Sequence, residues 1–282
     1  GLEAGYPSVI LAGGHVGCFE LVGTDRVHSI RDLKGKTVAV GVLADPGHVF
    51  LSAMAAYVGL DPPREINFVP QATDDTIALL AEGKIDAFMA FPTWTQALRA
   101  KKIGHVVVNS TVDRPWSQYF CCMIIGHREF VRQYPVATKR AMRAILKSAD
   151  LCALAPERAA RSLVDKGFAN QYEYALQLMR DLPYGKWRDY NPEDTVRFYA
   201  LRLHEAGMIK SSPQKAHRAG HRLALRQRIE EGAEGLKGPP GVAVAYDPTE
   251  VEFPVSARLR SRARGQKRYF VHHAAMCPFG VV

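Results

Sequence analysis

The stretch from residue 37 to residue 90 reads TVAVGVLADPGHVFLSAMAAYVGLDPPREINFVPQATDDTIALLAEGKIDAFMA. Within it, Asp45 followed by Pro46 predicts the cap and the first residue of a helix, because Asp accepts a hydrogen bond there and Pro fits the first turn. The expected elements are strands at 37–42, 66–69 and 85–90 and helices at 45–59 and 74–82. This alternation predicts a parallel sheet with helices on its faces, and ligands at the carboxyl ends of its strands.

The flanking sequence extends this α/β pattern in both directions. Residues 8–12 form a short apolar run that predicts a buried strand, which Gly13 and Gly14 would end in a loop. Downstream, the expected elements are strands at 105–108 and 119–125 and helices at 93–102, 129–168 (broken near Pro135 and Pro156), 172–182 and 192–206. The fold class predicted from these patterns is α/β, with a mostly helical second half.

Composition excludes several classes of protein. The 282 residues are 47% hydrophobic and 23% charged, which is typical of a globular chain, and no apolar run reaches about 18 residues, so we expect no membrane span. The five cysteines form no CxxC pair and therefore predict neither a zinc module nor a disulfide framework. No GxSxG, HExxH or P-loop pattern is present, so we expect a protein that is not an enzyme.

The net charge of +9 is concentrated at one end of the chain. Residues 216–282 hold 11 of the 37 Lys and Arg residues but only 6 of the 28 Asp and Glu residues. A basic tail can bind nucleic acid, but the rest of the chain is only mildly basic. We therefore expect no nucleic-acid partner and interpret residues 216–282 as an atypical basic tail.

Four segments carry a resemblance to a known family. They are LAGGHVGC (11–18), DLKGKTVAV (32–40), GKIDA (83–87) and YFCC (119–122). In this order and spacing they resemble the solute-binding proteins of ABC importers, in the nitrate, sulfonate and taurine group with its thiamine-pyrimidine-synthase-like relatives. The resemblance spans about residues 6–215.

The resemblance implies a two-lobed fold of the periplasmic-binding-protein type II class, whose lobes close by a hinge motion. Lobe 1 would comprise residues 1–37 and 124–215, and lobe 2 residues 38–123. The implied function is the extracytoplasmic solute-binding subunit of an ABC importer for a small sulfonate, nitrate-like or related organic solute. The implied partners are the permease and ATPase subunits. The protein would be a monomer in the periplasm or at the outer cell surface, without a cofactor.

Both ends of the chain depart from the family pattern. Family members begin with further strands and helices of lobe 1, so we expect lobe 1 to be incomplete here. Family members also end, soon after a segment like residues 209–215, with a short aromatic-bearing helix. Permitted codons for residues 216–236, read one base out of frame, can encode such a helix and a stop. We therefore interpret residues 216–282 as an out-of-frame product.

Two segments could offer backbone N–H groups to an anionic ligand, since glycines allow close approach and helix starts attract anions. The first is the predicted turn with Gly14, His15 and Val16; an ordinary strand-to-helix turn is the alternative. The second is the helix start with Asp45, Gly47 and His48. The Asp45 carboxylate would repel a dianion, which favours a zwitterion such as an aminosulfonate, or a neutral solute, over sulfate.

Aromatic residues near the ends of two strands could line the ligand-binding site. Phe91 and Trp94 follow the strand at 85–90, while Trp116, Ser117 and Tyr119 precede the strand at 119–125. Each of these residues could instead pack in the core or in a loop.

Cys121 and Cys122, together with His15, His48 and His127, raise the alternative of a pyrimidine-precursor-synthase-like or thiol/metal enzyme on the same fold. Neighbouring residues of a strand point to opposite faces, so the two thiols would not share one site. We therefore expect buried structural cysteines and no metal site.

Overall fold

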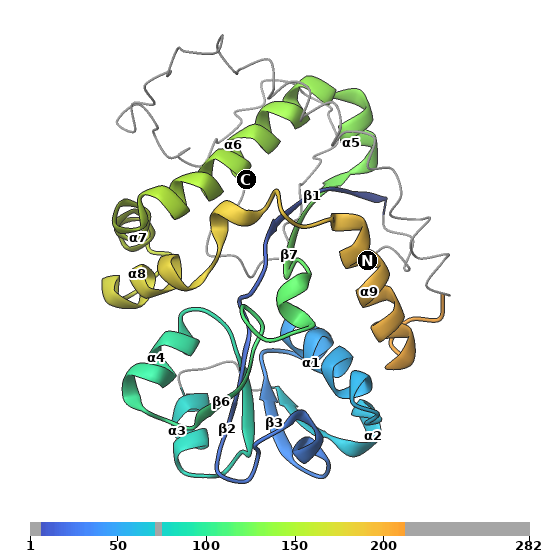
Figure 1. Ribbon diagram of the computed structural model, residues 1–282, viewed down its shortest axis with the longest axis vertical. Helices are drawn as coiled ribbons and strands as arrows, with labels where there is room; N and C mark the ends of the chain where they lie inside the picture. Colours follow the sequence, from blue (N-terminus) through green and yellow to red (C-terminus); the bar gives the residue numbers. More distant parts are fainter. Residues whose placement is uncertain (1–6, 71–74, 212–282) are drawn as a thin grey trace, which may run out of the picture.

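The computed structural model describes residues 7–70 and 75–211. In this part of the chain a five-stranded sheet and a two-stranded sheet are surrounded by helices (Figure 1). The strands are β1 (Ser8–His15), β2 (Glu20–Gly23), β3 (Thr37–Val40), β4 (Asn67–Pro70), β5 (Ala87–Ala90), β6 (His105–Asn109) and β7 (Cys122–His127). The α-helices are α1 (Pro46–Tyr57), α2 (Pro62–Glu65), α3 (Asp75–Ala81), α4 (Trp94–Lys101), α5 (Arg128–Gln133), α6 (Pro135–Leu154), α7 (Pro156–Asp165), α8 (Tyr172–Asp181) and α9 (Pro192–Glu205). Short 3-10 helices are η1 (Ile30–Leu33), η2 (Trp116–Gln118) and η3 (Tyr184–Lys186).

The five-stranded sheet has the order β4-β3-β5-β2-β6. β3 runs parallel to β4 and β5, as the β-α-β alternation predicts. β2 runs antiparallel to both β5 and β6, so the sheet is mixed rather than wholly parallel. The expectation of an α/β fold is thus confirmed, while β2 is a strand that the sequence analysis missed.

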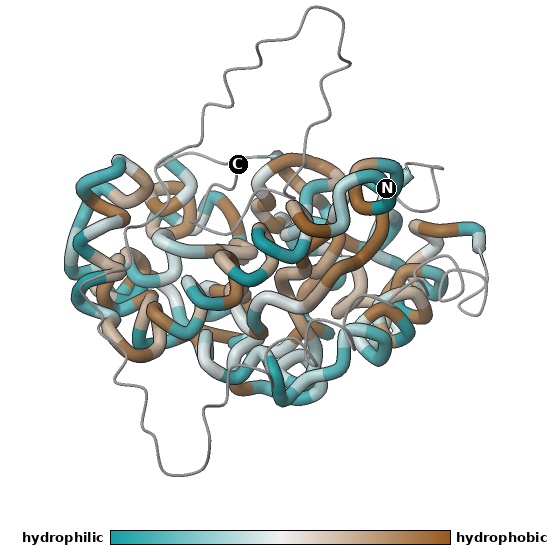
Figure 2. The backbone as a smooth tube through the Cα atoms, turned by 90° about the horizontal axis from the view of Figure 1, so that it is seen from above, coloured by the Kyte–Doolittle hydropathy of each residue, from teal (hydrophilic) through white to brown (hydrophobic). Residues whose placement is uncertain are grey.

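Each face of the five-stranded sheet has its own apolar core, because alternate residues of a strand point to opposite faces. Val38 and Met89 join the larger core with residues of α1, whereas Ala39 and Phe88 join a second core with residues of α3 and α4. In Figure 1, α1 and α2 lie on one side of the sheet and α3 and α4 on the other. Hydrophilic segments lie mostly at the periphery of the molecule (Figure 2).

The start of α1 confirms the predicted cap. The Asp45 carboxylate accepts a hydrogen bond from the backbone N–H of His48 at 2.7 Å, and Pro46 is the first residue of the helix. This bond satisfies one of the N–H groups that a helix start leaves without an intrahelical partner. The cap holds the loop after β3 against the start of α1.

The two-stranded sheet connects the two parts of the molecule. β1 pairs antiparallel with β7, and both strands run between the five-stranded sheet and the group formed by α5 to α8 (Figure 1). Residues 16–19 lead from β1 into β2, and residues 119–121 lead from η2 into β7. These two neighbouring connections, residues 16–19 and 119–121, are the crossing segments of the molecule.

Two elements that the family resemblance would assign to lobe 1 lie with the five-stranded sheet. β2 precedes residue 38, yet it pairs with β5 and β6 inside this sheet. α9 follows residue 123, yet it packs on α1. The predicted boundaries therefore separate both elements from the part that they join.

Other sequence-based predictions fall outside the described residues. The basic tail at 216–282, with its interpretation as an out-of-frame product, is one of them. Within residues 7–70 and 75–211, no helix combines the length and apolar character that crossing a membrane requires.

Candidate functional site

One edge of the five-stranded sheet gathers several predicted ligand-binding residues. Glu20, at the start of β2, pairs with Ala90 at the end of β5 and with Asn109 at the end of β6. The start of β2 therefore lies at the same edge as the ends of β3, β5 and β6. Asp45 follows β3 and Phe91 follows β5, so both lie in segments that leave this edge. This edge is the first candidate site.

The start of α1 at this edge already uses several of its own N–H donors. Besides the His48 N–H, the Asp45 carboxylate binds the N–H of Val42 at 2.9 Å. Nδ1 of His48 accepts a hydrogen bond from the N–H of Ala44 at 3.0 Å, and burial lowers the pKa of His48 against the opposing effect of Asp45. Gly47 is buried beside the Asp45 carboxylate. A ligand here would meet a neutral imidazole and a carboxylate.

Aromatic rings cover the sheet edge next to α1. The ring centroids of Phe91 and Trp94 lie 4.8 Å apart, and both side chains are half-buried. The ring of Phe91 also packs against the buried ring of Phe19, with a centroid distance of 6.5 Å, and the Phe19 ring packs against that of Phe50 in α1, with a centroid distance of 5.3 Å. Phe91 and Trp94 thus offer a partly exposed apolar surface; their role in ligand binding stays a prediction.

The other predicted aromatic residues lie between α1 and α9. Trp116 is 3% exposed and contacts Phe50 of α1 at 5.6 Å and Phe198 of α9 at 5.7 Å. Tyr119 stacks on Phe198 at 3.9 Å, and Ser117 of η2 is half-buried beside them. These contacts give Trp116 and Tyr119 a packing role, and their predicted contact with a ligand stays a prediction.

Gly14, His15 and Val16 do not form the expected turn. β1 continues through Gly13 and Gly14 to His15, and Gly13 and His15 pair with Met123 and Cys122 of β7 on either side of an irregularity at Gly14. A side chain at Gly13 would meet the ring of Phe120 at 2.2 Å, so a glycine is needed here for close packing. The expected end of this strand at Gly13 is therefore wrong, because β1 extends to His15. The role of Gly14, His15 and Val16 in ligand binding stays a prediction.

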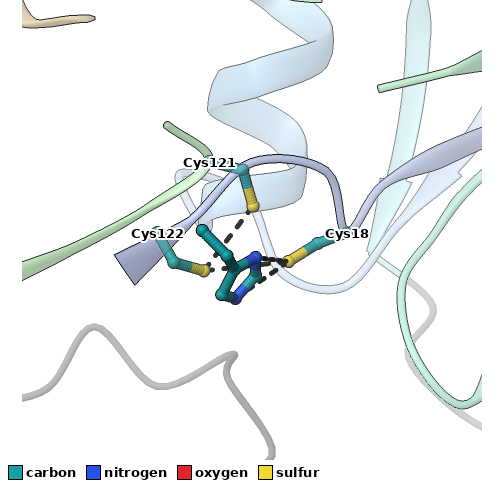
Figure 3. A group of neighbouring side chains, drawn as sticks. Cys18, Cys121 and Cys122 are labelled. Atoms are coloured by element: carbon teal, nitrogen blue, oxygen red, sulfur yellow. Dashed lines mark hydrogen bonds between the residues drawn. The ribbon is translucent and has the colours of Figure 1, made fainter. Parts of the chain in front are cut away.

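A cluster of three thiols and one imidazole forms the second candidate site (Figure 3). Sγ of Cys122 lies 3.5 Å from Sγ of Cys121 and 3.7 Å from Sγ of Cys18. Sγ of Cys18 lies 3.8 Å from each ring nitrogen of His15. One donor atom from each of the four residues can be chosen so that all lie within 4.8 Å of one another. The cluster joins the two crossing segments.

The expectation that Cys121 and Cys122 point apart is wrong. β7 begins at Cys122 rather than at Tyr119, so Cys121 precedes the strand and does not follow its alternation. The backbone N–H of Cys121 donates to the carbonyl of His15 at 3.2 Å, and Cys122 pairs with His15 across the two-stranded sheet. Both thiols thereby lie beside His15.

Cys18 completes the cluster and was not among the predicted site residues. Its φ is 143° and that of Gly17 is 74°, a pair of positive φ angles in the connection from β1 to β2. An L-residue rarely adopts such a φ, and strained residues of this kind concentrate at functional sites. Burial, followed by the neighbouring thiols of Cys121 and Cys122, raises the pKa of Cys18.

A polar bridge joins α4 to α8 near the sheet edge. The Asp181 carboxylate of α8 accepts a hydrogen bond from Gln96 at 3.2 Å and also pairs with Arg99. Arg99 lies 3.6 Å from the carboxylate of Glu20, whose Oε1 accepts a bond from Asn109 at 3.2 Å. This bridge connects the five-stranded sheet to the other part of the molecule.

The unfolding free energy of Glu20→Gln minus that of the original protein should increase as the pH rises from 4 to 7. Burial raises the pKa of Glu20; Arg99 lowers it and Asp181 raises it. A carboxyl group whose pKa is higher in the folded than in the unfolded state stabilises the fold when the pH is below the unfolded-state pKa. This stabilisation is lost as the pH rises through the folded-state pKa. The check is the difference in unfolding free energy between the two proteins at both pH values, from urea denaturation.

Asp32→Asn is the control, with the opposite sign. Hydrogen bonds from the N–H groups of His28 and Ser29 lower the pKa of Asp32, so its contribution to stability is present above the unfolded pKa and disappears in acid. Its replacement should therefore destabilise more at pH 7 than at pH 4. A Glu20→Gln difference that falls with rising pH would show that Glu20 is not held in a desolvating site.

The comparisons with known proteins agree with this architecture. The family model described as "NMT1/THI5 like" matches residues 16–159, just over half of the 282-residue chain. No curated protein matches the chain. The periplasmic sulfonate-binding protein SsuA of Methylobacillus flagellatus KT is similar in structure, with 17% identity, a TM-score of 0.58, and coverage of 85% of this chain and 74% of that one.

Two further solved structures are similar. The periplasmic nitrate-binding protein NrtA of Synechocystis PCC 6803 has 15% identity and a TM-score of 0.61, with 83% of this chain and 69% of that chain covered. The CA3427 protein of Candida albicans, described as having the generic periplasmic binding protein fold, has 11% identity and a TM-score of 0.57, with 78% and 74% covered. The chain belongs to the NMT1/THI5-like family and has the periplasmic binding protein fold.

Proposed function

We propose that the protein is the solute-binding subunit of an ABC importer for a small sulfonate, a nitrate-like anion or a related organic solute. The observation that carries this proposal is the sheet edge at which the start of α1 and the rings of Phe91 and Trp94 come together beside the crossing segments. Sulfonate- and nitrate-binding proteins are among the similar structures, which supports the solute class.

The proposed motion is a hinge closure of two lobes around the solute. We place β2 to β6 and the helices α1 to α4 in lobe 2, so this lobe starts before residue 38, and we place β1, β7 and α5 to α8 in lobe 1. The crossing segments are the proposed hinge. In this division the ion pair between Arg99 and Asp181 would join α4 of one lobe to α8 of the other.

The environment at α1 favours a zwitterionic or neutral solute over a dianion. Asp45 places a carboxylate beside the helix start, and this charge opposes a bound anion while it would attract an ammonium group. An aminosulfonate places both charges in one small molecule. We therefore propose aminosulfonates such as taurine as the preferred class.

The importer role also implies an oligomeric state, a location and partner subunits. The solute-binding subunit would work as a monomer in the periplasm or at the outer cell surface, and it would deliver its solute to a permease driven by an ATPase. Similar structures are described as periplasmic, which supports this location.

Thermal unfolding of the full chain with nitrate, sulfate, taurine, alkanesulfonates and aromatic sulfonates tests the solute class. A solute present at about 100 times its Kd adds about 2.7 kcal/mol to the unfolding free energy, which raises Tm by a few degrees for a chain of this size. We expect taurine or an alkanesulfonate to give this shift and sulfate to give less. A folded chain that no solute in this panel stabilises would contradict the proposal.

Phe91→Ala should remove about half or more of the stabilisation by the solute. Removing the ring takes away apolar surface that the solute would cover, so the affinity measured by calorimetry should fall about tenfold or more, since each 1.4 kcal/mol is tenfold. Phe168→Ala is the matched control, because Phe168 is 49% exposed and lies between α7 and α8, away from the sheet edge. Equal losses in both variants would remove Phe91 from the site.

The thiol cluster supports one alternative, a pyrimidine-precursor-synthase-like or thiol/metal enzyme on the same fold. The observation in its favour is that Cys18, Cys121 and Cys122 meet His15 in one place. Stoichiometric iron or pyridoxal phosphate in the purified protein would favour this alternative. Solute binding that is independent of any metal would favour the importer role.

A further inference from the structure

The second candidate site draws its side chains from both crossing segments and from the strand ends next to them. His15 is the last residue of β1 and Cys18 lies in the connection to β2, while Cys121 directly precedes β7 and Cys122 is its first residue. The three labelled thiols in Figure 3 point toward one another from these separate segments. Sequence-distant thiols that converge on one point are a typical arrangement of metal ligands.

The distances from the sulfur of Cys122 to the other two sulfurs are close to those of a tetrahedral metal site. In such a site with metal–sulfur distances of about 2.3 Å, neighbouring sulfur atoms lie about 3.8 Å apart. Sγ of Cys122 lies 3.5 Å from Sγ of Cys121 and 3.7 Å from Sγ of Cys18, and Sγ of Cys18 lies 3.8 Å from each imidazole nitrogen. Small shifts of these side chains would therefore suffice to hold an ion.

The imidazole of His15 can leave one ring nitrogen for a metal ion. Its Nδ1 lies 3.1 Å from the carbonyl oxygen of Val16, which can only accept, so a hydrogen bond between them places the proton on Nδ1 and leaves the lone pair on Nε2. Metal-bound histidines usually donate their second ring N–H to a carbonyl or carboxylate in this way. The ring is 3% exposed and its edge packs on Tyr184 at 5.1 Å, which limits its rotation.

We propose that His15, Cys18, Cys121 and Cys122 form a closed tetrahedral site for a thiophilic divalent cation of the zinc class. Three sulfur donors and one imidazole favour Zn²⁺ over Mg²⁺ or Ca²⁺, which take oxygen ligands. With four protein ligands the ion has no open position, so its role is structural. It would link the two crossing segments and restrict the rotation of one lobe against the other.

Metal titration of the reduced, chelator-treated full chain tests the site, with Zn²⁺ and then Co²⁺ as probes. We expect one ion per chain, and with Co²⁺ the near-ultraviolet sulfur-to-metal charge-transfer band and the intense visible bands of tetrahedral thiolate coordination. Competition with a chromophoric chelator gives the Kd. Zn²⁺ should also raise Tm, because the folded state binds it better than the unfolded state.

Cys18→Ser and Cys122→Ser should each weaken Zn²⁺ binding by more than about 100-fold, since loss of a residue that merely supports a ligand already weakens binding about 10–100-fold. Cys152→Ser is the matched control, because Cys152 is a buried cysteine of α6 outside the cluster. Cys277→Ser controls for the cysteine outside the described residues. Circular dichroism confirms that each variant is folded.

Several outcomes would overturn the proposal. A folded, reduced chain that binds less than one Co²⁺, or binds it with the weak bands of octahedral coordination, has no such site. Wild-type affinity in Cys122→Ser would exclude this thiol as a ligand. A disulfide between cluster cysteines that persists under reduction, or iron in place of zinc in the purified protein, would contradict a closed zinc-class site. None of these results depends on the identity of the solute.

Discussion

Trp116→Ala is expected to lower the free energy of unfolding by about 3–5 kcal/mol, the usual range for removing a fully packed aromatic side chain. Trp116 is 3% exposed, and its ring contacts Phe50 and Tyr57 of α1 and Phe198 of α9. The replacement would leave a cavity where η2, α1 and α9 meet. Urea denaturation followed by circular dichroism measures the change.

Trp116→Phe is the matched variant, because it keeps an aromatic ring at the centre of the cluster. It should retain more than half of the lost stability, since the cavity that it leaves is smaller. Solute affinity, measured where each variant remains folded, should be nearly unchanged. A Trp116→Ala protein that loses less than about 1 kcal/mol but fails to bind the solute would instead support the predicted ligand contact.

The unit from β3 to α1 could be predicted from sequence because its signals are local. The β-branched strand and the Asp45-Pro46 helix start lie within a few residues of one another, and each has a strong preference for the structure that it adopts. Most predicted helices agree for the same reason, including the breaks before Pro135 and Pro156.

β2 escaped prediction because its signal is short and its partners are distant. Only four residues, Glu20 to Gly23, form the strand, and a charged residue at its start breaks the apolar run. The pairing partners come from β5 and β6, more than 60 residues later. Local sequence preferences cannot predict that β2 will pair between β5 and β6. The sheet was therefore expected to be wholly parallel.

The thiol cluster escaped prediction because it depends on the residue at which β7 begins. Had β7 begun at Tyr119, alternation would have placed Cys121 and Cys122 on opposite faces. The strand begins at Cys122, and the hydrogen bond from the Cys121 N–H to the His15 carbonyl fixes the preceding residue beside β1. Cys18 reaches the cluster because its φ is 143°, a backbone conformation that the sequence does not predict for a residue other than glycine.

Gly17→Ala is expected to lower the unfolding free energy by about 2–5 kcal/mol. The φ of Gly17 is 74°, and an L-residue there costs about 1–2 kcal/mol. In addition, an added Cβ would lie 2.2 Å from Oγ1 of Thr111 and 3.0 Å from its Cα, so the backbone itself must shift. Such overpacking typically adds about 1–3 kcal/mol. Equilibrium urea denaturation is again the measurement.

Gly35→Ala separates the two causes. Gly35 has nearly the same φ, 71°, but no atom lies within 4 Å of the position of an added Cβ, so this variant should lose only the conformational part, about 1–2 kcal/mol. Thr111→Gly combined with Gly17→Ala completes a double-mutant cycle, in which relief of the clash should make the pair less destabilised than the sum of the single changes. Equal losses at Gly17 and Gly35 would contradict the close approach to Thr111.

The Gly17 variant also bears on the thiol cluster, because Gly17 precedes Cys18 in the same crossing segment. A shift of the backbone away from Thr111 would move Cys18 relative to Cys122, whose sulfur now lies 3.7 Å away. Gly17→Ala should therefore weaken Zn²⁺ binding in protein that remains folded, whereas Gly35→Ala, far from the cluster in sequence, should not. Unchanged Zn²⁺ affinity in a destabilised Gly17→Ala protein would show that the conformation at Gly17 serves the packing of the crossing segment and not the position of the Cys18 thiol.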